Sequence, residues 1–211
     1  HPIEKLISSF GQIPLPPYIK RKPNIKDSEF YQTVYANAKG SVAAPTAGLH
    51  FDYDLISKIK EKGILTDNIT LHVGAATFLP IKEQNIKNHA MHSESVFISK
   101  ELKKKIISVK ENKKKIYAVG TTSLRALESI KNINDELDEN FETNLFIKPG
   151  YKFKIVDRLI TNFHASKSSL FVLVKTFSKS NIDVLYDHAI NQKYLFLSYG
   201  DAMLIERWHF Q

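Results

Sequence analysis

The sequence predicts an α/β fold, and two features support that prediction. Behind a proline-dense connector, short apolar segments alternate with segments whose apolar residues recur at helical spacing. The chain has 211 residues, of which 43% are hydrophobic and 25% charged, a composition typical of a globular protein with a buried core. Because repeated β-then-α units with short connections place strands side by side, we expect a largely parallel sheet, open or closed into a barrel.

The N-terminal part predicts the end of a helix followed by a stiff connector. Residues 2–10 have a helical pattern, and prolines dominate residues 13–19. Each proline fixes its own φ and disfavours helix at the preceding residue, so this connector is expected to be extended. We therefore divide the chain into residues 1–23, the end of a preceding domain with a proline-rich connector, and residues 24–211, the main α/β domain.

The elements of the main domain follow from periodicity and capping signals. Asp52 is the expected N-cap of a helix over residues 52–62, which ends at Gly63, and Ser99 is the expected N-cap of a second helix. Strands are expected at 64–73, 95–98, 115–119, 153–160 and 202–205, further helices at 122–131 and 181–192, a surface loop at 132–144, and an apolar run of undecided type at 170–174.

Composition excludes several classes of protein. The absence of cysteine excludes disulfides, Cys-ligated zinc and thiol nucleophiles, and it fits the cytoplasmic location that we expect. No apolar run approaches the roughly 18 residues of a membrane span, and the first residues lack a signal-peptide pattern. A net charge of +8 favours phosphate-rich partners through long-range attraction, although a lysine-rich proteome would give the same balance.

Polar residues gather beside apolar stretches, where ligands bind in α/β folds. His50 precedes a predicted helix and is a candidate functional residue or a hydrogen-bonded core histidine. His72 lies near the end of a predicted strand. His92 and Glu94 alternate on an extended chain and so project to one face, for proton transfer, for a ribose hydroxyl, or as a surface ion pair.

A third polar segment follows the predicted strand over residues 115–119. Three hydroxyl residues open a helix here, and a helix start offers free N–H groups and a positive dipole end to an anion. The segment lacks the lysine spacing of a P-loop. Its candidate residues are Thr121, Thr122, Ser123 and Arg125.

A fourth polar segment follows the strand predicted at 153–160. Asn162 and His164 lie just beyond that apolar stretch, and Asp201 follows a glycine, as a turn residue or a catalytic one. Metal and serine-hydrolase sites are not indicated, because the sequence has neither an HExxH motif nor a G-x-S-x-G elbow.

These segments resemble the S-adenosylmethionine:tRNA ribosyltransferase-isomerases of queuosine biosynthesis. The resemblance implies that the chain is the C-terminal part of such an enzyme, mainly its barrel-like α/β domain, with a small β-rich domain mostly absent at the N-terminus. It extends in order over almost the whole chain, through residues 14–19, 31–35, 43–51, 71–74, 91–94, 119–123, 161–164 and 198–203.

The resemblance implies a specific reaction. The ribosyl unit of S-adenosylmethionine is transferred to the 7-aminomethyl-7-deazaguanine base (preQ1) in a tRNA anticodon loop and rearranged to an epoxycyclopentanediol. The product is epoxyqueuosine, and adenine and methionine are released. S-adenosylmethionine is thus a cosubstrate, and no metal is implied. Such chemistry needs a base for the carbon beside the sulfonium, an acid for adenine, and groups that hold the ribose hydroxyls.

The resemblance also suggests roles for the candidate residues. The base and acid are expected among His50, His72, His92 and His164, with Glu94 orienting one of them or the ribose. Asn162 is expected to hold a base or sugar edge, and Phe51 and Phe163 to stack on a base. The methionine carboxylate or a phosphate is expected at Thr121, Thr122, Ser123 and Arg125, further substrate contacts at Thr46 and Asp201, and RNA phosphate contacts at Lys20, Arg21 and Lys22.

Two rival functions come from other classes. A noncatalytic RNA-binding remnant would keep the basic surface without the chemistry. An unrelated S-adenosylmethionine methyltransferase is disfavoured, because the sequence lacks an early strand–Gly-x-Gly–helix unit followed by an acidic strand end. The sequence gives no indication of protein partners.

Overall fold

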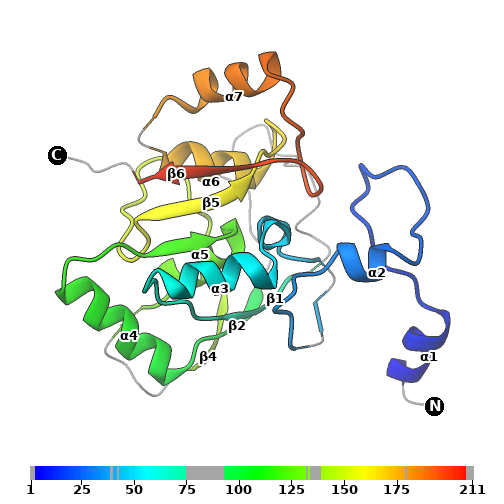
Figure 1. Cartoon of the computed structure of the whole chain (residues 1–211), viewed down its shortest axis with the longest axis horizontal. Coiled ribbons are helices and arrows are strands. Elements are labelled where there is room, and N and C mark those ends of the chain that lie inside the picture. The colour runs from blue at the N-terminus through cyan, green and yellow to red at the C-terminus, as the bar shows by residue number, and fades with distance from the viewer. Residues whose placement is uncertain are drawn as a thin grey trace.

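The structure is a computed structural model that describes residues 3–38, 40–41, 43–74, 93–131, 133, 139–178 and 180–207. Its strands form two three-stranded sheets. One sheet has the order β1 (Thr70–His72), β2 (Glu94–Phe97) and β4 (Asn140–Thr143). The other has the order β3 (Tyr117–Val119), β5 (Arg158–Asn162) and β6 (Ala202–Glu206). Figure 1 shows helices beside and between these two sheets, with the N-terminal segment, in blue, lying to one side of them.

The α/β class is confirmed, but the barrel-like arrangement and the largely parallel sheet are not seen. Of the four strand pairings in the described residues, β3–β5 is parallel and the other three are antiparallel, and the strands form two open sheets rather than a closed barrel. The expectation assumed that strands would follow one another in a single sheet. Instead, β4 pairs with β2 in the sheet that contains β1, and β6 pairs antiparallel with β5 after two intervening helices.

Local signals set the positions of the helices. Side-chain oxygens of Asp52 and Ser99 accept hydrogen bonds from the backbone N–H of Leu55 and Leu102, as expected of N-caps, and Gly63 follows the first of these helices at φ +73°. The helices are α1 (Ile3–Phe10), α2 (Asp27–Phe30), the 3-10 helix η1 (Thr46–His50), α3 (Tyr53–Glu61), α4 (Lys100–Glu111), α5 (Thr121–Glu128), α6 (Ser169–Phe177) and α7 (Ile182–Asn191).

Several predicted boundaries were wrong. The strand expected at 64–73 is confined to β1, and the one expected at 153–160 is displaced to β5. The segment expected as a loop at 132–144 contains β4, whose polar sequence hides a strand that buries Thr143. The undecided run at 170–174 belongs to the helix α6.

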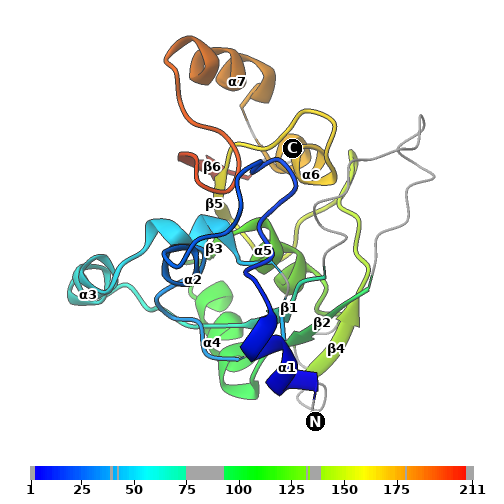
Figure 2. The same ribbon diagram turned by 90° about the vertical axis from the view of Figure 1, so that its right-hand side faces the viewer.

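Helix α5 lies between the two sheets (Figure 2). It contacts β3 and β5 of one sheet, β1 of the other, and the helix α6. Leu124 and Ala126 have no solvent exposure, and the core continues through Leu159 of β5 and Phe177 of α6. The segment of residues 12–38, which we call the strap, joins α1 to the main body and includes α2; its proline-rich residues 13–19 contain no helix, as predicted.

The last residue of α5, Glu128, is a buried carboxylate. Its oxygens accept hydrogen bonds from the backbone N–H groups of Lys154, Ile155 and Val156 at 2.8, 2.9 and 2.8 Å. These N–H groups have no strand partner, because the segment before β5 is irregular. Glu128 therefore fixes the entry to β5, the strand that leads into the polar segment after it.

We predict that Glu128→Ala strongly destabilises the fold. It leaves three N–H groups without their acceptor, and a buried unsatisfied group costs about 1–3 kcal/mol, so a loss of roughly 3 kcal/mol or more in the free energy of unfolding is expected. Urea denaturation measures this loss. The control is Glu142→Ala, which removes an exposed carboxylate that accepts one bond from Ser93. Equal losses in the two variants would contradict the assignment.

Candidate functional site

The parallel strands β3 and β5 end at the same edge of their sheet, and polar groups collect there. Gly120 follows β3 at φ +91° and opens α5, and Asn162 is the last residue of β5. The 3-10 helix η1 packs against this edge, since a Cβ added to Gly120 would lie 4.0 Å from the Cβ of Ala47. This is where ligands gather in sheets with parallel strands.

The side-chain amide of Asn162 is the centre of the cluster. It is 2% exposed, and its Oδ1 accepts a hydrogen bond of 2.9 Å from the hydroxyl of Thr46. Its Nδ2 lies 3.3 Å from the carbonyl oxygen of Gly200, 3.4 Å from that of Asp201 and 3.3 Å from Nε2 of His50. The three segments that meet here are far apart in the sequence.

This geometry determines which ring nitrogen of neutral His50 carries the proton. Carbonyl oxygens can only accept, so the amide nitrogen of Asn162, rather than its oxygen, faces Gly200 and Asp201. The same nitrogen donates toward His50, so Nε2 carries a lone pair and neutral His50 has its proton on Nδ1. His50 is itself exposed, so an imidazole lies at the surface with one ring nitrogen oriented by a buried amide.

His164 lies on the other face of β5. Thr161 and Asn162 are neighbours in a strand, so their side chains point to opposite faces. The hydroxyl of Thr161 lies 2.9 Å from Nε2 of His164, and the His164 N–H donates to the Tyr186 hydroxyl of α7 at 2.9 Å. Burial lowers the pKa of His164 to about 4.

His50 and His164, two of the four candidate histidines, therefore lie on opposite faces of β5. His72, at the end of β1, lies against the backbone of Gly40, where an added Cβ would be 3.0 Å from Nδ1 of the imidazole. Gly40 has φ +124°, so this position needs glycine for two reasons. His92 lies outside the described residues. Among the described histidines, His50 makes a hydrogen-bond contact with the Asn162 amide at the end of β5.

Glu94 and Arg125 meet each other in the interior. Nη1 of Arg125 lies 2.5 Å from Oε2 of Glu94, and its Nε donates to the carbonyl of Leu145 at 3.0 Å. Both residues are buried, at 7% and 2% exposure. The sequence placed Arg125 beside an anion at the start of α5, but α5 turns it toward β2, and Glu94 orients this guanidinium. Removing either partner would leave a buried charge.

Some of the remaining substrate candidates are half-buried, and others are buried in the core. Thr122 and Ser123 are half-buried at the start of α5, Thr121 is buried, and Phe51 is half-buried after η1. The Asp201 carboxylate accepts the Leu195 N–H at 2.7 Å, which is a turn contact. Phe163 is 5% exposed and packs against the rings of Tyr186, Tyr194 and Phe196, so its placement is that of a core aromatic residue.

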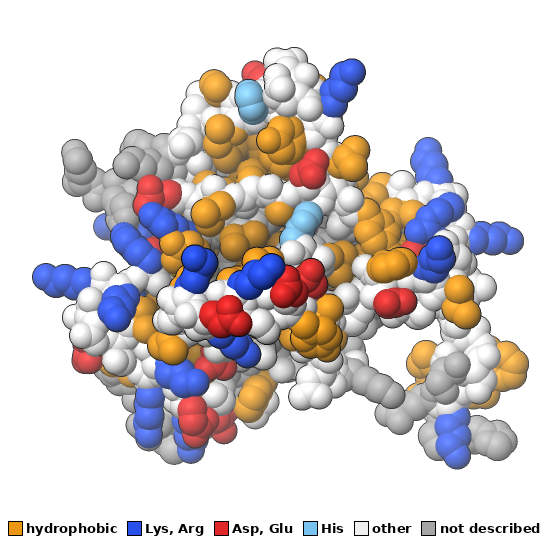
Figure 3. Space-filling view, viewed as in Figure 1, with side chains coloured by type: hydrophobic (Ala, Val, Ile, Leu, Met, Phe, Trp, Pro, Cys, Tyr) orange, Lys and Arg blue, Asp and Glu red, His pale blue; other side chains and the backbone are white. Residues whose placement is uncertain are grey.

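The three basic candidates on the strap differ in their contacts. Lys20 and Lys22 are exposed, whereas Arg21 makes two hydrogen bonds of 2.6 Å to the carboxylate of Asp27. Arg21 is therefore engaged within the strap, which the local charge pattern did not indicate. Figure 3 shows Lys and Arg side chains gathered over the part of the surface near α2.

The sequence analysis included residues 14–19 and 198–203 in the resemblance but missed the contacts that join the strap to the turn before β6. The Tyr18 hydroxyl is hydrogen-bonded to Ser198, and the Tyr199 hydroxyl donates to Asp27 at 3.0 Å. These pairs are separated by about 170 residues or more, so no local spacing could have found them. Within the part of the chain that the structure describes, no three His, Asp or Glu residues group as metal ligands, and no helix is long and apolar enough to cross a bilayer.

Comparison with known proteins adds an independent finding. The family described as "Queuosine biosynthesis protein" matches residues 1–205. The chain is 53% identical over 203 residues to the S-adenosylmethionine:tRNA ribosyltransferase-isomerase of Vesicomyosocius okutanii. That alignment covers 96% of this chain and 60% of the relative. The chain is 52% identical to the enzyme of the same name from Polynucleobacter asymbioticus, again over 96% of this chain and 58% of the relative. The chain thus spans about three fifths of the length of these relatives.

A solved structure is also similar. The crystal structure of S-adenosylmethionine tRNA ribosyltransferase from Thermotoga maritima aligns with a TM-score of 0.61 at 38% sequence identity. The alignment covers 75% of this chain and 51% of that one. The two proteins therefore share their fold over three quarters of this chain.

The His164 site predicts a pH dependence of stability. The imidazole has a pKa of about 4 in the folded chain against 6.5 ordinarily, so between these values the unfolded chain binds a proton that the folded chain does not. The free energy of unfolding should therefore be highest above pH 6.5 and should fall by about 3 kcal/mol as the pH drops to 4. Urea denaturation across this range, compared with His164→Gln, isolates the contribution; the same slope in both proteins would contradict it.

Proposed function

Since this chain belongs to the family of queuosine biosynthesis proteins, we propose that it forms part of an S-adenosylmethionine:tRNA ribosyltransferase-isomerase. The full-length protein would move the ribosyl unit of S-adenosylmethionine onto preQ1 in a tRNA anticodon loop, in the cytoplasm. Epoxyqueuosine would form, and adenine and methionine would leave. The observation that carries this proposal is the agreement of the family match with a polar cluster at the edge where β3 and β5 end.

The cluster supports acid–base chemistry through His50. Ribosyl transfer needs one proton removed from the carbon beside the sulfonium and one delivered to the departing adenine. Imidazole is the side chain best suited to move protons near neutral pH. Asn162 orients the ring of His50, and the hydroxyl of Thr46 fixes Asn162 in turn. We assign one of the two proton transfers to His50.

The other candidates take supporting roles in this proposal. Thr122 and Ser123 stand at the start of α5, where the N–H groups of a helix suit a carboxylate. Glu94 and Arg125 hold α5 against β2 from inside, so they keep this helix start in place rather than contact a ligand. Phe51 directly follows η1, and His72 lies at the end of β1 beside Gly40; both stay candidates for substrate contact.

We predict that His50→Ala in the full-length protein lowers turnover by about 10²–10⁴-fold, the usual effect of losing a general acid or base. Asn162→Ala should lower turnover less, because it misplaces the imidazole without removing it. The measurement is adenine release from S-adenosylmethionine with precursor tRNA.

The matched control is His188→Ala, which removes an exposed histidine of α7. It should turn over like the wild type. Full activity in His50→Ala would refute its assignment. In the wild type, S-adenosylhomocysteine as the product would indicate a methyltransferase, and tRNA binding without either product would indicate a noncatalytic RNA-binding module.

The tRNA contact is proposed at Lys20 and Lys22. Both are exposed on the strap, and a lysine that contacts a phosphate releases counterions on binding. We predict that Lys20→Ala with Lys22→Ala weakens tRNA binding and reduces the slope of log affinity against log salt by about one for each lysine–phosphate pair removed. The control pair is Lys148→Ala with Lys152→Ala, which removes two exposed lysines from one loop.

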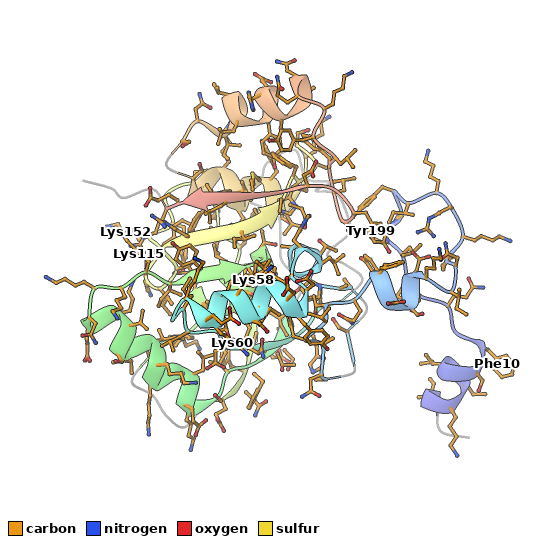
Figure 4. The ribbon with its side chains drawn as sticks, viewed as in Figure 1. Phe10, Lys58, Lys60, Lys115, Lys152 and Tyr199 are labelled. Carbon is orange, nitrogen blue, oxygen red and sulfur yellow. The ribbon has the colours of Figure 1, made fainter. Side chains whose placement is uncertain are left out.

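Figure 4 shows Lys152 on the side of the molecule away from the strap. The control pair removes the same charge there, so it tests whether position rather than net charge matters. Equal slopes for both double variants would contradict a strap contact.

A further inference from the structure

The strap holds a buried carboxylate that points at the turn before β6. Asp27 is 2% exposed, and besides its two bonds from Arg21 it accepts the Asn24 N–H at 2.8 Å. Arg21 and this N–H hold the pKa of Asp27 well below its usual range, so the group is an anion near neutral pH. The Tyr199 hydroxyl donates to it at 3.0 Å. Asp27 is therefore hydrogen-bonded to Arg21 and Asn24 within the strap and to Tyr199 outside it.

Two further contacts join the same surfaces. The hydroxyls of Tyr18 and Ser198 are hydrogen-bonded. The ring of Tyr31, which is buried, packs edge-on against the ring of Tyr199 with 5.7 Å between centroids. Figure 4 shows Tyr199 at the junction between the strap and the chain that leads into β6. The strap thus contacts residues 198 and 199 at three points.

The turn over residues 195–201 is built as a tight unit. Asp201 closes it, since its N–H donates to the Leu195 carbonyl at 2.8 Å and its carboxylate accepts the Leu195 N–H at 2.7 Å. Gly200 donates to the Leu197 carbonyl at 3.0 Å, and a Cβ at Gly200 would lie 2.4 Å from the Leu195 oxygen, so glycine is required. A displacement of Tyr199 must therefore move Gly200 and Asp201 as well.

Gly200 and Asp201 are the residues whose carbonyls accept from Asn162. The contacts from Asp27 through Tyr199 and the turn end at the amide that orients His50. Each step in this series is a hydrogen bond or a covalent neighbour. The position of His50 is therefore set from two sides, by η1 and by the strap.

We propose that Asp27 and Tyr199 are positioning residues, which latch the strap to the 195–201 turn and so hold Asn162 and His50 in their working geometry. The catalytic consequence rests on the function proposed above. We call the Asp27–Tyr199 pair the latch. A shift of about 1 Å at a catalytic group can lower the rate by up to about 100-fold, so the latch can affect turnover although it touches no reacting atom.

The test compares Asp27→Asn and Tyr199→Phe with Tyr53→Phe in the full-length protein. Tyr53→Phe is the matched control, because its hydroxyl donates to the Val34 carbonyl of the strap at 2.7 Å but does not contact the turn. Amide hydrogen exchange of residues 195–201 is measured first. It should speed up in the two latch variants and stay unchanged in the control.

Adenine release is measured next. In the latch variants kcat should fall by about 10- to 100-fold, with KM for S-adenosylmethionine within about threefold of the wild type, since no binding group is removed. Unchanged exchange in the turn would overturn the latch. Faster exchange with an unchanged kcat would overturn its positioning role.

The exchange measurement does not depend on turnover. A wild-type protein that released no adenine would refute the proposed function, and the latch would then stand or fall on exchange alone. A drop in the protection of all peptides, rather than of residues 195–201, would show that the variants act on global stability and would overturn the proposal.

Discussion

The buried amide of Asn162 is the interaction on which the arrangement of the candidate site depends. A primary amide has two donors and an accepting oxygen, so one side chain can join three segments if each offers the complementary group. Here Thr46 supplies a donor, and Gly200, Asp201 and His50 supply acceptors. Because the amide is 2% exposed, water cannot replace these partners, and leaving them unmet is costly. The end of β5, the helix η1 and the turn before β6 are thereby fixed relative to one another.

Side chains along β5 point alternately to its two faces, and this separates two chemical environments that are adjacent in the sequence. Thr161 and Asn162 are adjacent, but one serves His164 and α7 and the other serves the exposed His50 and η1. Burial keeps His164 neutral over most of the pH range, which suits a structural histidine. His50 keeps contact with solvent and has one oriented nitrogen, which suits a proton carrier.

Three buried carboxylates serve the fold in this structure, and one of them, Glu94, is a catalytic candidate from the sequence. Glu94 pairs with Arg125, Glu128 accepts three backbone N–H groups, and Asp27 holds Arg21 and Tyr199. All three carboxylates are buried, and a buried charge is tolerated when partners satisfy it. They hold α5, β5 and the strap, the elements that border the cluster around Asn162. The proposed function accordingly assigns proton transfer to the exposed His50 rather than to these carboxylates.

The sequence by itself determined the α/β class, the caps at Asp52 and Ser99, and the resemblance that the family match confirms, because helical periodicity, capping and motifs are local properties of the chain. It also singled out His50, Thr46 and Asn162. Only the tertiary structure decided strand direction, the pairing of Arg125 with Glu94, the separation of His164 from His50, and the contacts of Asp27 with Tyr199. These depend on which distant segments pack together, and burial, not spacing, selects those partners.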